Sequence, residues 1–408
     1  MKCKLNLIAV FFLFLYSCQN EIPMVNLGIN DVYTVERMKK IIMHPEFPGQ
    51  YEWSVPDKNG NDSLVSTERD YIFLAENPGE YFLKLRIIDP VNPVEHDVRI
   101  VVWEEQVAYS RYITQVYEYR PAPGQFINTM PMYKAGDTEE TMRRKAQESI
   151  SGTNDVMISL GGFGGYVTFG FDHTVVNVPG EKDFKIIGNA FYAVGNPNPN
   201  APDDGGSVEP GIVMVSLDRN GNGISDDEWY ELAGSEYYKS ETMHHYEITY
   251  DRPSPDKSPT PKPETPFSDT TFVHWEDNQG KDGYIVKNIY HKQEYYPKWI
   301  SAEQLTFSGT KLANNVVDES GEGIYFVQYA YDWGYVDNHP NEQEDKISFD
   351  IGWAVDKNGN KVHLPGVDFI RVYTGLNQQC GWLGETSTEL SRAEDLHIKE
   401  QTVVLPDP

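Results

Sequence analysis

Apolar and polar residues alternate along residues 25 to 105 with the period of two that is typical of β-strands. Turn-forming Asn, Gly and Pro residues separate the alternating runs. Their number and spacing predict an antiparallel sandwich of immunoglobulin (Ig) size over residues 25 to 105. The clearest runs are Tyr51–Val55, Asp70–Leu74, Tyr81–Ile88 and Asp97–Trp103.

Residues 106 to 408 repeat the strand signal many times without helices in alternation. Short apolar runs separated by Gly, Pro and Asn are typical of a β-sandwich or jelly roll. The sequence therefore predicts an all-β protein, in which an Ig-like sandwich precedes a larger jelly-roll-like β-sandwich. The strands expected in the larger domain are Val156–Leu160, Tyr166–Phe171, Phe184–Ile187, Gly211–Leu217, Tyr246–Tyr250, Gly283–Ile289, Ile347–Ala354 and Phe369–Tyr373.

Two segments of the larger domain depart from the strand pattern. Thr138–Ile150 has acidic residues in its first turn and Gly152 beyond its end, which predicts one helix with Asp137 as its N-cap. Few of its positions are apolar, so we expect it on the surface over the sheet. Residues 252–266 contain six prolines and predict an extended loop.

The N-terminus has the pattern of an export signal. Lys2 and Lys4 precede the apolar run Leu5–Tyr16, which is too short to span a bilayer as a permanent helix. The segment Leu15–Cys18 resembles the bacterial lipobox, in which the cysteine becomes lipidated and forms the new N-terminus. An ordinary signal peptide that contains a cysteine is the alternative. The pattern predicts a signal peptide over 1–17, a tether over 18–24, and lipid on Cys18 as the membrane anchor.

The formal net charge of the chain is -28 at pH 7. This charge repels nucleic acid and anionic lipid, and it suits a surface that binds cations or neutral ligands. After loss of the signal and lipidation of Cys18, Cys380 is the only thiol left, so no disulfide can form within the chain. Cys380 has no adjacent His, and we expect it to be a packing residue.

The segment Asp218–Glu228 contains the sharpest motif. Oxygen-bearing side chains at positions 1, 3 and 5, and Gly at position 6, match the spacing of a calcium loop, and the motif resembles those of thrombospondin-type repeats. Position 12 is Trp229, so Glu228 or Glu231 would have to replace the missing bidentate acid. An Asn-Gly hairpin turn is the alternative. The predicted ligands of a structural calcium ion are Asp218, Asn220, Asn222, Ile224, Asp226 and Glu228.

Aromatic residues alternate with Asp, Asn and Glu in Tyr329–Asn338 and Gly381–Glu389. Such stretches suit a flat, partly polar ligand, such as a sugar face or a corrin ring, although packing in the core is the alternative for each ring. No G-x-S-x-G or H-E-x-x-H motif occurs, and no Lys-Ser or Lys-Thr follows the glycines of Gly161–Gly165 as in a phosphate loop. We therefore expect a binding protein rather than an enzyme.

Two families are similar to this chain. The domain over residues 25–105 resembles a PKD-type Ig-like domain, which implies a spacer. This resemblance rests on Tyr51, Trp53, Pro78-Gly79, Tyr81, Leu83, Leu85 and Asp89. The larger domain resembles a domain of surface lipoproteins from gut Bacteroidota. Members with PKD-like modules look like the BtuH-type cobalamin-binding lipoproteins, which implies a place beside an outer-membrane vitamin B12 transporter. The second resemblance rests on Glu118–Phe126, Gly161–Tyr166, Phe171–His173, Gly188–Phe191, Glu209–Val213, Glu228–Ser235 and Asp368–Thr374.

The residues alone predict export and a lipid anchor, and the resemblance implies an outer-membrane lipoprotein, exposed on the cell surface, that takes part in nutrient uptake. The main hypothesis is that it binds cobalamin for delivery to an outer-membrane transporter. Two alternatives remain: a carbohydrate-binding lipoprotein of a glycan-uptake system, and a non-catalytic adhesion or structural protein. The predicted ligand pocket consists of loops with Asn189, Glu209, Trp333, Tyr335, Asp337, Asn338 and Trp382.

Overall fold

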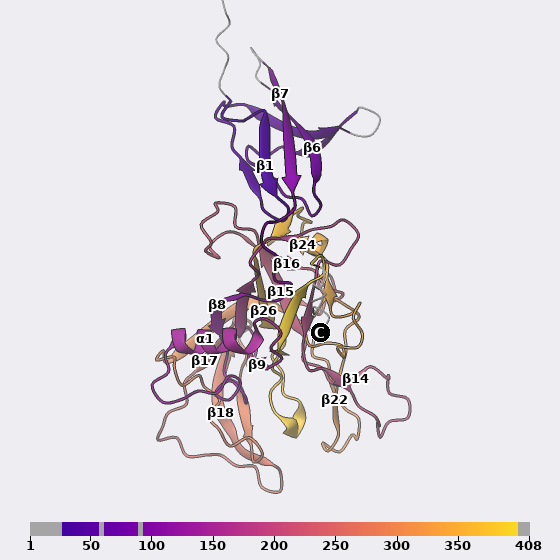
Figure 1. Ribbon diagram of the computed structural model, residues 1–408. Helices are drawn as coiled ribbons and strands as arrows, with labels where there is room; N and C mark the ends of the chain where they lie inside the picture. Colours follow the sequence, from indigo (N-terminus) through magenta and orange to yellow (C-terminus); the bar gives the residue numbers. More distant parts are fainter. Residues whose placement is uncertain (1–26, 57–60, 89–92, 399–408) are drawn as a thin grey trace, which may run out of the picture. The chain divides into compact units, whose positions relative to one another are not determined.

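The computed structural model describes residues 27–56, 61–88 and 93–398 (Figure 1). The predicted signal peptide, Cys18 and the tether lie outside the described residues. Strands dominate the rest, and the part of the chain that is described contains a single α-helix. The prediction of an all-β protein with one short helix is confirmed. No helix among the described residues is long and apolar enough to cross a membrane.

The N-terminal strands form a five-stranded sheet with the order β1-β7-β6-β3-β4. Every second side chain is buried in the later part of β6 and of β7, as in Leu83, Leu85 and Ile87, which is the alternation that the sequence shows. The sheet is mixed rather than purely antiparallel, because β1 pairs in parallel with β7 while β3 pairs antiparallel with β4 and β6. The bounds are β1 Val32–Glu36, β2 Ile41–Met43, β3 Gln50–Pro56, β4 Asp62–Ser66, β5 Tyr71–Phe73, β6 Gly79–Ile88 and β7 Val94–Trp103.

The larger domain is built around a six-stranded sheet, β24-β16-β15-β26-β10-β8, and a four-stranded sheet, β19-β18-β17-β20. The ring of Phe163 packs edge-on against Tyr246 of β17 and Tyr373 of β26, so the two sheets share one core. The bounds are β8 Gln115–Arg120, β10 Tyr166–Gly170, β15 Gly211–Ser216, β16 Trp229–Leu232, β17 Met243–Asp251, β18 Phe267–Asp277, β19 Asp282–Asn288, β20 Gln304–Lys311, β24 Ala354–Val355 and β26 Phe369–Thr374.

Smaller sheets complete the domain. They have the orders β13-β14-β22-β21, β23-β12-β28, β11-β25 and β27-β9. Two 3-10 helices, η1 (Ile351–Trp353) and η2 (Gly381–Leu383), lie between strands. The bounds are β9 Ile158–Ser159, β11 Val175–Val176, β12 Phe184–Ile187, β13 Phe191–Tyr192, β14 Gly205–Ser207, β21 Val316–Asp318, β22 Phe326–Tyr329, β23 Ser348–Phe349, β25 Gly366–Val367, β27 Glu389–Leu390 and β28 Arg392–Asp395.

The helix α1 (Glu139–Ile150) packs against β8 and β9 (Figure 1). Its few apolar side chains, Met142, Ala146 and Ile150, are fully buried. The predicted N-cap is wrong by one residue: the hydroxyl of Thr138 accepts a hydrogen bond from the Thr141 backbone N–H at 3.2 Å, as an N-cap does. Asp137 instead accepts from the backbone N–H of Lys134, because it closes the turn that precedes the helix.

The expectation of one strand over Ile347–Ala354 is also wrong. Its first residues form β23, but the Asp350 carboxylate then accepts a hydrogen bond from the Gly352 backbone N–H at 2.7 Å and caps η1. This local bond competes with the strand, which resumes only at Ala354 in β24. The proline-rich residues 252–266 contain no strand and connect β17 to β18.

Candidate functional site

A cleft of about 420 Å³ lies in the larger domain. Its lining comes from β13, β14, β22 and η2, together with Gln125 and Phe126 of the loop that follows β8. Segments that are far apart in the sequence thus meet at one hollow. A cleft of this volume is within the range of small-molecule sites.

Apolar side chains form the rim and walls of the cleft. Phe191 is 58% exposed, Ile324 63% and Leu383 44%, although each is large and apolar. Trp382 is fixed by a hydrogen bond that its ring nitrogen donates to the Ile324 carbonyl at 3.2 Å. Exposed apolar side chains gathered around a hollow indicate a surface that another molecule covers.

Close packing between η2 and β22 forms one wall of the cleft. Gly381 has a φ of 51°, and a Cβ atom at this position would lie 2.1 Å from the ring of Phe326. Only glycine permits this approach without a shift of the aromatic ring. Gly381 therefore allows Trp382 and Phe326 to line the same cleft.

Two acidic residues, Glu209 and Glu385, line the same cleft. Glu209 precedes β15, and the Ser387 backbone N–H donates a hydrogen bond to its Oε1 at 3.1 Å. Glu385 is only 6% exposed, and Gln125 donates a backbone hydrogen bond to its Oε1. Its Oε2 is buried and has no hydrogen-bond partner. A buried acidic oxygen without a partner is costly, and it points to a group that completes this cleft.

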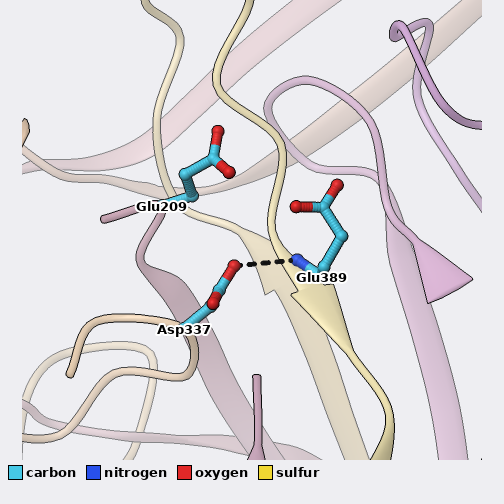
Figure 2. Close-up of side chains that lie close together, drawn as sticks. All are labelled: Glu209, Asp337 and Glu389. Carbon is cyan, nitrogen blue, oxygen red and sulfur yellow. Dashed lines mark hydrogen bonds between the residues drawn. The ribbon is translucent and has the colours of Figure 1, made fainter. Parts of the chain in front are cut away.

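Glu209 also belongs to a cluster with Asp337 and Glu389, in which one carboxylate oxygen of each residue lies within 4.8 Å of the others. Figure 2 shows the three side chains together, with Glu389 at the start of β27. The Glu389 backbone N–H donates to Asp337 Oδ2 at 3.1 Å, and the Ser387 hydroxyl donates to Glu389 Oε1 at 2.7 Å. Asn189 donates its backbone N–H to Asp337 Oδ1 at 2.7 Å. Hydrogen bonds donated by two segments, at Asn189 and at 387–389, therefore hold the cluster.

The backbone at Asp337 is strained to fit this arrangement, since its φ of 56° is in the left-handed region. The Glu209 backbone N–H donates to the Asp337 carbonyl at 2.9 Å and fixes that conformation from the neighbouring segment. The strained backbone conformation thus places the Asp337 carboxylate in the cluster.

Burial raises the pKa of Glu209, Asp337, Glu389 and Glu385. Repulsion from the neighbouring carboxylates raises the pKa of Glu209, Asp337 and Glu385 further. None of the largest causes of the four shifts is a lysine, arginine or histidine of the described residues. These basic residues therefore do not dominate the electrostatics of the described part of the site.

The structure brings together four of the seven residues of the predicted ligand pocket. Asn189, Glu209 and Asp337 meet at the cluster, and Trp382 lies on the cleft. The other three do not line it. Tyr335 is buried and accepts a hydrogen bond from the Glu236 backbone, Asn338 is buried and bonds both backbone groups of Tyr331, and Trp333 packs against Trp353 at a centroid distance of 4.6 Å.

Sequence reasoning missed Glu385, Glu389 and the cleft walls Phe191 and Phe326. A weak signal was present, because Glu385, Ser387 and Glu389 alternate with small polar residues and so share one face of an extended segment. Nothing in the sequence shows that this face meets Glu209.

The predicted calcium loop connects β15 to β16, which pair as an antiparallel hairpin. Asp218 accepts backbone hydrogen bonds from Gly221 at 2.7 Å, Asn222 at 3.1 Å and Gly223 at 3.0 Å. Glu228 accepts from the hydroxyl of Tyr230, and Glu231 faces away from the loop, where it accepts from Thr310. The loop therefore has the hydrogen bonds of the hairpin alternative, and calcium binding there stays a prediction.

Cys380 is buried and unpaired by disulfide. Burial raises the pKa of its thiol to about 12. A thiol with this pKa is almost entirely protonated at neutral pH, which suits packing and not nucleophilic chemistry.

No protein-family model matches the chain, and the curated proteins contain no significant match. Three solved structures show weak likeness. A quinoprotein alcohol dehydrogenase-like protein from Bacteroides thetaiotaomicron is 19% identical over 24% of this chain and 22% of that chain, with a TM-score of 0.17. A structure described for carbohydrate-binding modules of the β-sandwich superfamily is 11% identical over 89% and 92% of the two chains, with a TM-score of 0.15. A SusE-like protein is 9% identical over 87% and 92%, with a TM-score of 0.22. Likeness at these scores carries no argument for a ligand.

Proposed function

We propose that this chain is an exported, lipid-anchored surface protein that binds a carbohydrate in the cleft and serves glycan uptake with a membrane transporter. The observation on which the proposal rests is the pairing of exposed apolar walls, Phe191 and Trp382, with the acidic residues Glu209 and Glu385 in one cleft. A sugar ring has an apolar C–H face and a rim of hydroxyl groups, and it needs both kinds of contact at once.

Cobalamin is the second candidate, since Phe191 and Leu383 could cover part of a corrin edge. Cobalamin is several times larger than the ligands that usually fill a cleft of about 420 Å³. It would have to lie mostly outside the cleft. The dimensions of the cleft therefore favour a carbohydrate.

The cluster geometry favours binding over hydrolysis. Retaining glycosidases place their two carboxyl groups about 5–5.5 Å apart on either side of the scissile bond. Of the three cluster residues only Glu209 lines the cleft, so the cluster does not place two carboxyl groups on either side of a ligand bound there. A purely structural or adhesive role, in turn, would not explain a cleft with exposed apolar walls.

The test is calorimetric titration of oligosaccharides of stated composition, and separately of cyanocobalamin, into the full chain in detergent. We expect Trp382→Ala to weaken carbohydrate binding at least tenfold, because the wall of the cleft is lost. Trp333→Ala is the matched control, since it removes the same side chain outside the cleft, and its affinity should be unchanged.

Three results would contradict the proposal. Binding of cyanocobalamin but of no carbohydrate would favour the second candidate. Equal effects of the two tryptophan variants would place the ligand elsewhere. Release of reducing sugar from a bound oligosaccharide would show an enzyme.

A further inference from the structure

The carboxylate cluster needs a compensating positive charge whenever its members are ionised. Glu209, Asp337 and Glu389 lie together, and none of them forms an ion pair with a described Lys, Arg or His. Like charges at this separation repel strongly in a buried site. Either protons or a bound cation must neutralise the cluster.

The distances suit a cation of the size of calcium. Calcium binds oxygen ligands at about 2.3–2.6 Å, so two ligands on opposite sides of one ion are about 4.8 Å apart. The oxygens of Glu209, Asp337 and Glu389 all lie within 4.8 Å of one another. A set of carboxylate oxygens without Cys or His is typical of a hard cation.

The side-chain amide of Asn189 lies against the Asp337 carboxylate. One polar atom of its side-chain amide lies 2.9 Å from Asp337 Oδ1 and 3.1 Å from Oδ2. With nitrogen in this position, the amide donates to Asp337. With oxygen in this position, the amide faces the carboxylate and would be a neutral ligand of a shared cation, as calcium sites often contain.

A separate observation also points to a ligand beside the cluster. Glu385 is two residues before Ser387, which donates hydrogen bonds to both Glu209 and Glu389. Its Oε2 is buried without a partner, and the residue lines the cleft together with Glu209. The cleft is therefore lined both by a member of the cluster, Glu209, and by a buried carboxylate oxygen of Glu385 that no described residue satisfies.

We infer that Glu209, Asp337 and Glu389 bind one calcium-class divalent cation at the inner end of the cleft, and that this cation also contacts hydroxyl groups of the carbohydrate. The first part stands on the cluster alone. The second part rests on the proposed function. Three carboxylates leave coordination positions open, and vicinal sugar hydroxyls are oxygen ligands that can occupy them.

The experiment titrates calcium chloride into the full chain after treatment with EDTA and removal of the chelator. We expect one site that Glu389→Gln weakens at least tenfold, because it removes a charged ligand but keeps the size of the side chain. Asp218→Asn is the matched control, since it changes the other calcium candidate, the hairpin loop before β16. Loss of the site in Asp218→Asn with full binding in Glu389→Gln, or no calcium binding at all, would overturn the inference.

Thermal unfolding separates loss of a ligand from loss of the fold. In EDTA, Glu389→Gln should melt at or above the temperature of the parent chain, because one repulsive charge is gone. Calcium should raise the melting temperature of the parent chain and not that of the variant. Glu209→Gln, which changes the half-buried member of the cluster, is the second variant. Its melting temperature should respond to EDTA and calcium as that of Glu389→Gln does. A calcium-induced rise that is equal in all three chains would contradict the site.

The carbohydrate titration is then repeated with calcium and with EDTA. At least tenfold weaker binding in EDTA supports contact between cation and carbohydrate. Equal binding in both buffers overturns that contact and leaves the proposed function standing. Calcium binding by the cluster without any carbohydrate binding overturns the proposed function and leaves the cation site standing.

Discussion

The buried acid Glu231 of β16 links the stability of the larger domain to pH, separately from the carboxylates of the candidate site. Burial raises its pKa from 4.5 to about 7, against a smaller opposing effect of the hydrogen bond from the Thr310 hydroxyl at 2.6 Å. The folded protein therefore binds this proton more tightly than the unfolded chain does. The resulting stabilisation is fully present below pH 4.5 and is lost as the pH rises through 7.

We expect Glu231→Gln to remove this dependence. A rise in pKa from 4.5 to about 7 corresponds to about 3 kcal/mol in the free energy of unfolding. The difference in unfolding free energy, variant minus parent, should increase by up to that amount between pH 4.5 and 8. Denaturant unfolding at a series of pH values measures it, with Glu228→Gln in the same hairpin as the control. A difference that stays constant over this range would mean that Glu231 is not protonated in the folded protein.

At the scale of the element, the N-terminal end of α1 allows a direct test of the helix cap. The hydroxyl of Thr138 caps the helix through the Thr141 N–H. Thr138→Ala should lower the free energy of unfolding by about 1 kcal/mol, the usual cost of losing an N-cap, while Thr138→Ser keeps the hydroxyl and should change little. Urea unfolding of the three chains measures both. Equal losses in Ala and Ser variants would show that the methyl group matters and not the cap.

Elements with strong local signals could be predicted from the sequence. The strand Phe184–Ile187 is β12 residue for residue, since alternation and flanking turns agree there. Ile347–Ala354 was not predictable in the same way, because the Asp350 side chain redirects the backbone. Only part of the candidate site could be predicted from the sequence. Asp337 stands out by its polar and aromatic surroundings and Glu209 by the segment that carries the family resemblance. Asp337 and Glu389, however, meet across 52 residues through a hydrogen bond that only the topology creates.

At the scale of the whole molecule, ligand binding and the proposed membrane attachment involve different parts of the chain. The cleft and the carboxylate cluster concern what is bound, and they are formed by residues from Gln125 onward. Under the proposed function Cys18 decides where the protein is held, and this residue lies outside the described residues. The charge of -28 disfavours electrostatic attachment to anionic lipid, so the proposed membrane attachment depends on the acyl chains.

Replacing Cys18 should therefore change location and leave binding intact. The full chain, expressed in a bacterium that processes lipoproteins, should lose residues 1–17 and partition into the detergent phase of Triton X-114. Each buried CH₂ of an acyl chain contributes about 0.8 kcal/mol, so a diacylated cysteine holds the body firmly. Cys18→Ser should remain in the aqueous phase and bind calcium and carbohydrate with the affinities of the parent. Mass spectrometry of the N-terminus decides the remaining alternative: cleavage without an acylated Cys18 would indicate an ordinary signal peptide, and the anchor would have to be abandoned.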